Sequence, residues 1–146
     1  MPNHGKYAAF CCLTVLVALY VVGAVSHGSL RHEVQTLPLW FPIVLGFRQR
    51  DLAKWCALPC LIFWLAIMAL IWSFLLGWSH IVSGHFSPVE IAMTVVIGVA
   101  CAFGIGTIFR WRAAVRPLAA AGVVVLFGAL QLIAFRVSLL PGIADR

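Results

Sequence analysis

Four stretches of apolar sequence, each free of Asp, Glu, Lys and Arg, most constrain what this chain can fold into. They cover residues 7–25, 55–76, 91–109 and 117–135. A helix of about 20 apolar residues is long enough to cross the roughly 30 Å hydrocarbon core of a bilayer. We therefore predict an all-α integral membrane protein, a four-transmembrane-helix bundle that forms a single domain over residues 1–146.

The composition agrees with lipid as the solvent. Hydrophobic residues make up 64% of the 146 residues and charged residues 10%, whereas soluble domains are about 45–50% apolar and about 25% charged. Four spans leave no room for a separate soluble domain. We therefore expect any site to lie between helices, in the connections or at a contact with another subunit.

The net charge of +6 does not indicate a nucleic-acid partner. The Arg and Lys residues flank the apolar stretches, where they set topology and contact anionic head groups. Membrane lipids are therefore the expected partners, together with other membrane subunits or a second copy of the chain.

The first stretch has a second interpretation as a cleaved signal peptide, because Lys6 precedes it and small residues occupy positions 24–26. The apolar core of a signal peptide usually has about 7–15 residues. Residues 7–25 are longer, so we expect a retained span.

The basic residues next to the spans predict an orientation, because they gather on the cytoplasmic side. With four crossings, seven of them fall in the first and third connections, and three fall on the other side. This count predicts that both termini are non-cytoplasmic. The preference for Arg over Lys suits a bacterial inner membrane. The seven are Arg31, Arg48, Arg50, Lys54, Arg110, Arg112 and Arg116, and the three are Lys6, Arg136 and Arg146.

The first connection contains an apolar segment, residues 37–47, that is too short to cross the bilayer and includes two prolines. It is expected to lie in the cytoplasmic interface or to form a short re-entrant segment. The interface is favoured, because irregular backbone at depth needs protein or water around it. Such a segment would serve as a docking surface or as a floor under its own bundle.

Small residues recur at intervals of four in the third stretch, at Gly98, Ala102 and Gly106. Such stripes allow two helices in a membrane to approach closely. The stripe is interpreted as a contact inside the bundle or, alternatively, as a contact with another subunit.

Apart from cysteine and tyrosine, ionisable side chains are absent from the middle of every stretch, so the candidates for chemistry lie at the edges. The polar run after the first stretch contains His27, Arg31, His32 and Glu33. It would offer an acid–base pair or a phosphate-binding Arg, or it is a turn that contacts lipid head groups.

Glu90 and Arg136 are a candidate ion pair near the outer ends of the third and fourth stretches. The alternative is a capping carboxylate and an Arg that extends to the head groups. Ser87, Pro88 and Glu90 have the pattern of a helix start with a capping box.

Neither the histidines nor the cysteines define a metal or redox site. His80 and His85 are weak candidates as metal ligands, because no defined ligand set accompanies them. Cys56 and Cys60 share a helical face, but all five cysteines lie in apolar stretches, which is typical of packing. No metal and no cofactor is predicted.

Three functions remain open. The leading hypothesis is a small non-catalytic protein, an accessory or structural subunit of a larger membrane complex. The second is a transporter or channel component whose pathway forms on oligomerisation, with Thr94, Thr107 and Gln131 along a polar seam. The third is a membrane-embedded enzyme that acts on lipid or quinone, which requires the polar run to converge on a pocket.

Overall fold

The computed structural model describes residues 3–81 and 84–144, and all secondary structure in them is helical. The elements are α1 (His4–Val25), α2 (Ser29–Thr36), the 3₁₀ helix η1 (Leu37–Leu39), α3 (Trp40–Phe47), α4 (Leu52–Leu75), α5 (Pro88–Arg110), α6 (Pro117–Ser138) and α7 (Pro141–Ala144).

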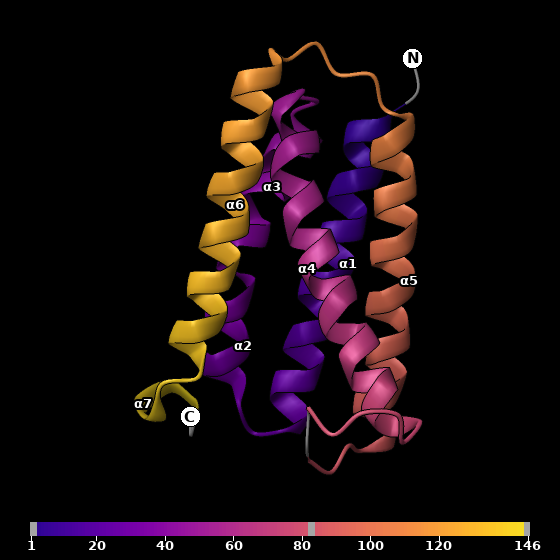
Figure 1. Ribbon diagram of the computed structural model, residues 1–146, viewed down its shortest axis with the longest axis vertical. Coiled ribbons are helices and arrows are strands. Elements are labelled where there is room, and N and C mark those ends of the chain that lie inside the picture. Colours follow the sequence, from indigo (N-terminus) through magenta and orange to yellow (C-terminus); the bar gives the residue numbers. More distant parts are fainter. Residues whose placement is uncertain (1–2, 82–83, 145–146) are drawn as a thin grey trace.

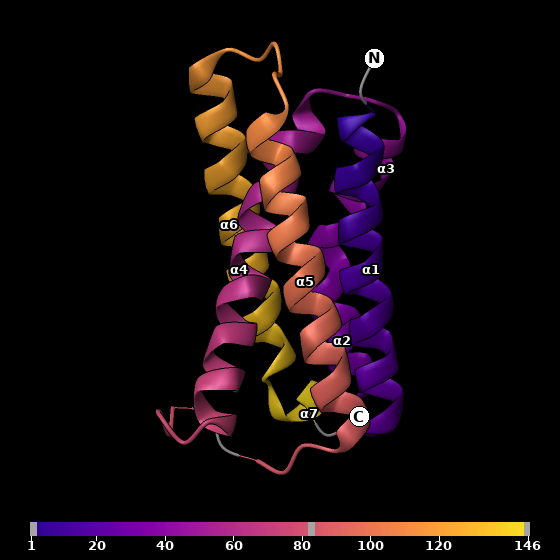
Figure 2. The same cartoon turned by 90° about the vertical axis from the view of Figure 1, so that its right-hand side faces the viewer.

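Four helices, α1, α4, α5 and α6, are long and apolar enough to cross a membrane. They run along the long axis of the molecule (Figure 1 and Figure 2), and each corresponds to one of the apolar stretches. The predicted fold class, an all-α membrane protein built on a four-helix bundle, is confirmed.

The order of the helices in space differs from their order in the chain. α4 packs against both α5 and α6, while α1 packs mainly against α5. Figure 1 shows α4 between α6 and α5. Consecutive helices α5 and α6 are therefore not packing neighbours, so the candidate ion pair of Glu90 and Arg136 would have to bridge helices that do not adjoin.

The first connection runs back along the whole bundle as α2, η1 and α3 (Figure 1). At one end of the bundle, Gln35 Nε2 in α2 donates to Ser138 Oγ at the end of α6, at 2.9 Å. At the other end, Gln49 Nε2 after α3 donates to Asn3 Oδ1 before α1, at 3.3 Å. The expectation of an interfacial or short re-entrant segment is wrong. Residues 37–47 are instead the second half of a broken helical leg, shielded on one side by α1 and α4.

This additional leg separates the chain ends. The beginning of α1 lies beside the end of α3, whereas α7 packs against α2 at the opposite end of the bundle (Figure 1). The prediction that both termini lie on the same side is therefore wrong. In the described residues the legs number five, counting α2, η1 and α3 as one, and an odd number of legs leaves the two ends of the chain at opposite ends of the bundle.

Close helix packing uses different small residues from those expected. A Cβ added at Gly104 in α5 would lie 2.8 Å from Leu61 Cδ1 and 3.0 Å from Cys11 Cβ. A Cβ added at Gly46 in α3 would lie 2.8 Å from Ala9 Cβ. The absence of a side chain at these glycines lets the helices approach closely.

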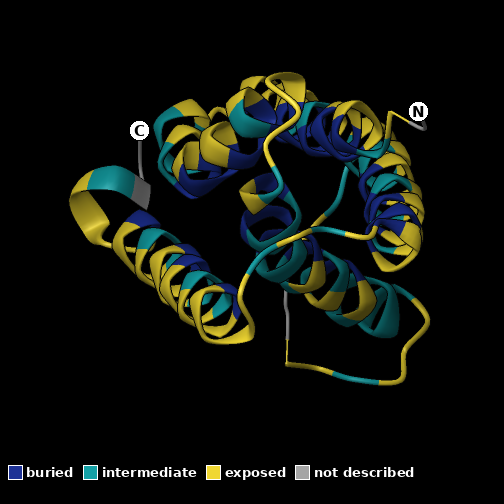
Figure 3. Cartoon of the chain, turned by 90° about the horizontal axis from the view of Figure 1, so that it is seen from above, coloured by how far each residue is buried: buried dark blue, intermediate teal, exposed yellow. Residues whose placement is uncertain are grey.

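The stripe predicted in α5 does not lie inside the bundle. A Cβ added at Gly98 or Gly106 would have no atom within 4 Å, and Ala102 is exposed. Figure 3 shows exposed residues on the outer surfaces of the helices and buried residues turned inward. The interpretation as an internal contact is therefore wrong, and the outward-facing stripe is free to contact lipid or another chain.

Candidate functional site

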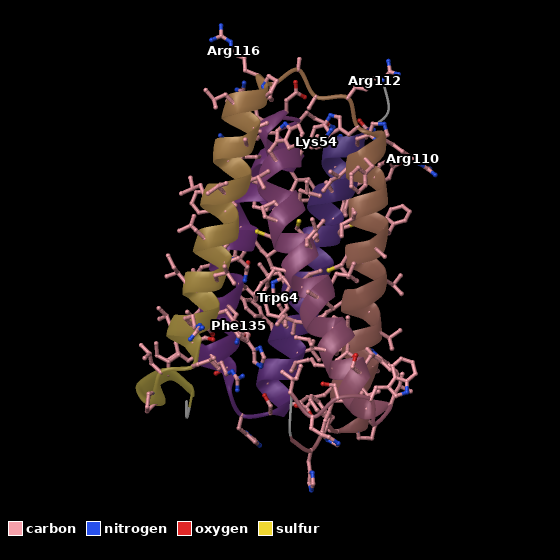
Figure 4. The ribbon with its side chains drawn as sticks, in the orientation of Figure 1. Lys54, Trp64, Arg110, Arg112, Arg116 and Phe135 are labelled. Carbon is pink, nitrogen blue, oxygen red and sulfur yellow. The ribbon has the colours of Figure 1, made fainter. Side chains whose placement is uncertain are left out.

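A pocket of about 340 Å³ lies between the helices near the end of the bundle where α1 and α4 end and α5 begins. We call it the polar pocket. Trp64 and Phe135, both lining residues, lie near mid-height in Figure 4. Its polar lining comprises Ser26, Arg31, His32, Gln35, His85, Glu90 and Thr94.

The pocket becomes less polar toward the middle of the bundle. On α5, Glu90 in the first turn and Thr94 in the next are followed by the apolar Ile97. On α1, the lining passes from Ser26 at the helix end to Leu19 two turns inward. The pocket therefore has the same polarity gradient as a lipid leaflet.

Three nitrogen atoms of the lining are buried without a hydrogen-bond partner. They are Arg31 Nε and His32 Nδ1 from α2, and Trp64 Nε1 from α4. The Trp64 side chain is only 2% exposed. Buried polar atoms in proteins nearly always have a partner, so these three nitrogens are exceptions among residues that line one pocket.

Glu90 combines a local structural role with its place in the pocket. Its Oε2 accepts a hydrogen bond from Ser87 N at 2.7 Å, and Glu90 N donates to Ser87 Oγ at 3.3 Å. This is the capping box expected from the sequence, and it is confirmed. The carboxylate is thereby held in the pocket lining with Arg31 and His32, while Arg136 is exposed on α6.

Gln35 links the pocket to a buried polar contact between α2 and α6. The Gln131 side chain donates through Nε2 to the main-chain oxygen of Gln35, at 3.0 Å. This carbonyl lies where α2 gives way to the 3₁₀ turn at Pro38, and the last carbonyls of a helix lack intrahelical partners. This interhelical hydrogen bond from Gln131 thus supports the break in the leg.

The structure brings together only half of the polar run. Arg31 and His32 line the polar pocket, whereas His27 and Glu33 are exposed and lie outside its lining. His32 and Glu33 are adjacent on α2 and point in different directions, as helix geometry requires.

The weak metal candidates are also separated. His85 lines the pocket, and His80 does not. Within residues 3–81 and 84–144, no group of three or more His, Cys, Asp or Glu is placed to hold a metal ion. The five cysteines are free and buried.

Thr94 and Thr107 face their own bundle. Both are buried, and their hydroxyls donate to main-chain oxygens of α5, those of Ile91 and Phe103. With Gln131 also buried, these residues do not form the outward-facing seam that a pathway built by oligomerisation would need.

Two pocket residues were not recognised from the sequence as parts of a ligand site. Trp64 lies near the middle of α4, although Trp in membrane proteins usually gathers at the interfaces. An indole N–H at mid-span needs a partner, and this is the signal that would have drawn attention to it. The sequence predicts capping or a pair with Arg136 for Glu90. It does not show that Glu90 lies near α2, because this proximity depends on the tertiary structure.

The opposite end of the bundle is strongly basic. Figure 4 shows Lys54, Arg110, Arg112 and Arg116 there. Lys54 Nζ donates to Trp111 O at 2.6 Å and lies 4.7 Å from the centre of the Trp55 ring. This Lys therefore ties the start of α4 to the end of α5, and the three Arg side chains are exposed.

Comparison of the chain with known protein families, with curated proteins and with solved structures finds no match. The polar pocket and the distribution of charge along the bundle are therefore the features from which a function is inferred.

Proposed function

We propose that the protein is an integral membrane protein that binds an amphiphile, a lipid or a quinone, in the polar pocket. The observation that carries this proposal is the set of unpartnered nitrogens of Arg31, His32 and Trp64 around one pocket. Ionisable side chains within a membrane bundle are costly and mark functional sites. A pocket with a few convergent polar groups is the expected form of a small-molecule site.

The shape of the pocket supports an amphiphile over a wholly polar ligand. Ile97 lies seven positions after Glu90, which corresponds to about 10 Å along α5. Over this distance the lining changes from charged to apolar. A molecule with a polar head and an apolar continuation matches both ends.

The same geometry favours binding over acid–base catalysis by the polar run. Glu33 is exposed and lies outside the pocket, so it cannot act with His32 on one bound molecule. His32 remains as an interacting group for the ligand, and no nucleophile is proposed.

The test is to purify the full chain in a mild detergent and to identify the bound small molecules by mass spectrometry. A stoichiometric lipid or quinone is expected with the wild-type protein and should be lost with Arg31→Gln. The matched control is Arg136→Gln, which removes an exposed Arg from α6. No retained amphiphile, or equal retention by both variants, would contradict the proposal.

The charge distribution supports a proposal for orientation. With five legs, the end of the bundle opposite the pocket carries seven basic residues, a set that differs from the seven counted with four crossings. The one described acid at this end is Asp51. Basic residues gather on the cytoplasmic side, so we place this end on the cytoplasmic side of a bacterial inner membrane. The polar pocket then opens toward the outer leaflet. The basic residues of this end are Lys6, Arg48, Arg50, Lys54, Arg110, Arg112 and Arg116.

A second proposed function is that of an accessory subunit in a larger membrane complex. It is supported by the outward-facing stripe of Gly98, Ala102 and Gly106 on α5, because small residues favour contact between helices of different chains. The same purification tests it. A stoichiometric protein partner that is lost with Gly98→Leu/Ala102→Leu supports the proposal, and a chain that purifies without any partner contradicts it.

A further inference from the structure

We infer that the ligand of the polar pocket is the head group of a zwitterionic phospholipid that carries a phosphate and a protonated primary amine, as in an ethanolamine phospholipid. This inference rests on the proposed amphiphile-binding function and names its ligand class. It starts from the two opposite charges that Arg31 and Glu90 bring to one pocket.

The phosphate half matches the unpartnered nitrogens. Arg31 Nε and Trp64 Nε1 carry hydrogens and accept nothing, and both are buried without a partner. Phosphate oxygens are strong acceptors, and Arg is the side chain best suited to hold them. His32 Nδ1 is also unpartnered, and His32 lines the same pocket.

The amine half matches Glu90. An ionised carboxylate only accepts hydrogen bonds and has about four lone-pair positions. The one hydrogen bond from Ser87 N to Oε2 leaves capacity for a protonated amine. Glu90 is on α5 and Arg31 is on α2, so the two charges approach the pocket from different helices.

The pair of charges selects between classes of lipid. An anionic lipid without an amine would satisfy Arg31 but would leave Glu90 beside a second negative charge, which is unfavourable. A quinone would accept from the donors but would offer no cation to Glu90. A zwitterionic head group satisfies both charges at once.

The volume agrees with a head group. Small-molecule pockets span about 300–1,000 Å³, and about 340 Å³ is near the lower limit. The phosphate and amine therefore fill the pocket, and most of the acyl chains lie in the surrounding bilayer.

The experiment uses the full chain, equilibrated with vesicles that contain equal amounts of ethanolamine, glycerol and choline phospholipids with identical acyl chains. The lipids retained in mild detergent are quantified by mass spectrometry. We expect about tenfold preference for the ethanolamine lipid over the glycerol lipid, because a charged hydrogen bond to Glu90 is gained. The choline lipid should be weaker too, because its quaternary amine has no N–H to donate.

The decisive variant is Glu90→Gln, because Gln at this helix position still completes a capping box while the charge is removed. It should abolish the preference for the ethanolamine lipid and leave total lipid retention in place. Arg31→Gln should lower retention of all phospholipids about tenfold, and Trp64→Phe, which keeps an aromatic ring, should lower it about fivefold. The control is Glu33→Gln, an exposed acid of α2 outside the pocket.

The outcomes separate the two levels of the proposal. Retention of lipid or quinone that depends on Arg31 but shows no ethanolamine preference overturns this inference and leaves the proposed function standing. Absence of any retained amphiphile overturns both. Soluble phosphoethanolamine is added as a competitor in the last experiment. If it competes as well as the lipid at equal concentration, the ligand is a free phosphorylated amine and the assignment to a phospholipid is overturned.

Discussion

At the residue scale, burial separates glycines that look alike in the sequence. Gly104 and Gly106 lie two positions apart on α5, yet a Cβ at Gly104 would lie 2.8 Å from Leu61, and a Cβ at Gly106 would have nothing within 4 Å. The regular spacing of four drew attention to Gly106 and away from Gly104. Only the face of α5 that contains Gly104 packs against α1 and α4.

A matched pair of substitutions follows from this contrast. Gly104→Leu is expected to destabilise the protein by about 1–3 kcal/mol, because extra methylenes in a packed contact force shifts in their neighbours. Gly106→Leu adds the same side chain on an exposed surface and should change stability little. Thermal unfolding of both purified variants in one detergent measures the difference. Equal unfolding temperatures would contradict the close contact of Gly104 with Cys11 and Leu61.

At the element scale, the leg formed by α2, η1 and α3 is the least regular part of the protein, and side chains of α6 support it. Gln131 Nε2 donates to Gln35 O, and Gln35 Nε2 donates to Ser138 Oγ, at 2.9 Å. Irregular backbone at membrane depth is tolerated only where protein or water satisfies it. The leg therefore depends on α6 for its polar contacts as well as for packing.

Ser138→Ala tests this dependence. It leaves the buried Gln35 amide without its acceptor and should cost about 1–3 kcal/mol, the desolvation penalty of an unsatisfied donor. The double variant Gln35→Met/Ser138→Ala removes both groups and should be more stable than Ser138→Ala alone. Ser73→Ala is the control, because Ser73 Oγ donates only to Ala69 O in its own helix. Thermal unfolding in detergent is the measurement, and a double variant less stable than the single one would contradict the contact.

At the scale of the whole molecule, five legs place the two ends of the first connection on opposite sides of the bundle. α2 begins near the end of α1, and the chain leaves α3 near the beginning of α1. The described basic and acidic residues at the pocket end, Arg31, Arg136, Glu33 and Glu90, balance one another. The net charge of the bundle therefore belongs to the other end.

Single cysteines at the two ends of the first connection test this topology. Ser29→Cys and Arg50→Cys are both on exposed positions, and the five native cysteines are buried, so a membrane-impermeant thiol reagent should report the new thiol. In intact cells we expect labelling of Ser29→Cys alone, with Arg50→Cys labelled only after lysis. Labelling of both from the same side would contradict the crossing leg and restore a four-pass topology.

The sequence by itself determined that the chain is helical, that it belongs in a membrane, where its four long helices lie and how α5 begins. These are local properties, because the transfer of an apolar stretch into lipid and the capping of Ser87 by Glu90 depend on residues close in the chain. The tertiary structure alone decided the path of the first connection, the inward face of α5 and the meeting of Arg31, Trp64 and Glu90 in one pocket. Lipid is as apolar as a helix interior, so hydropathy does not distinguish an inward face from an outward one. The separation of α5 from α6 by α4 follows from packing between residues far apart in the sequence.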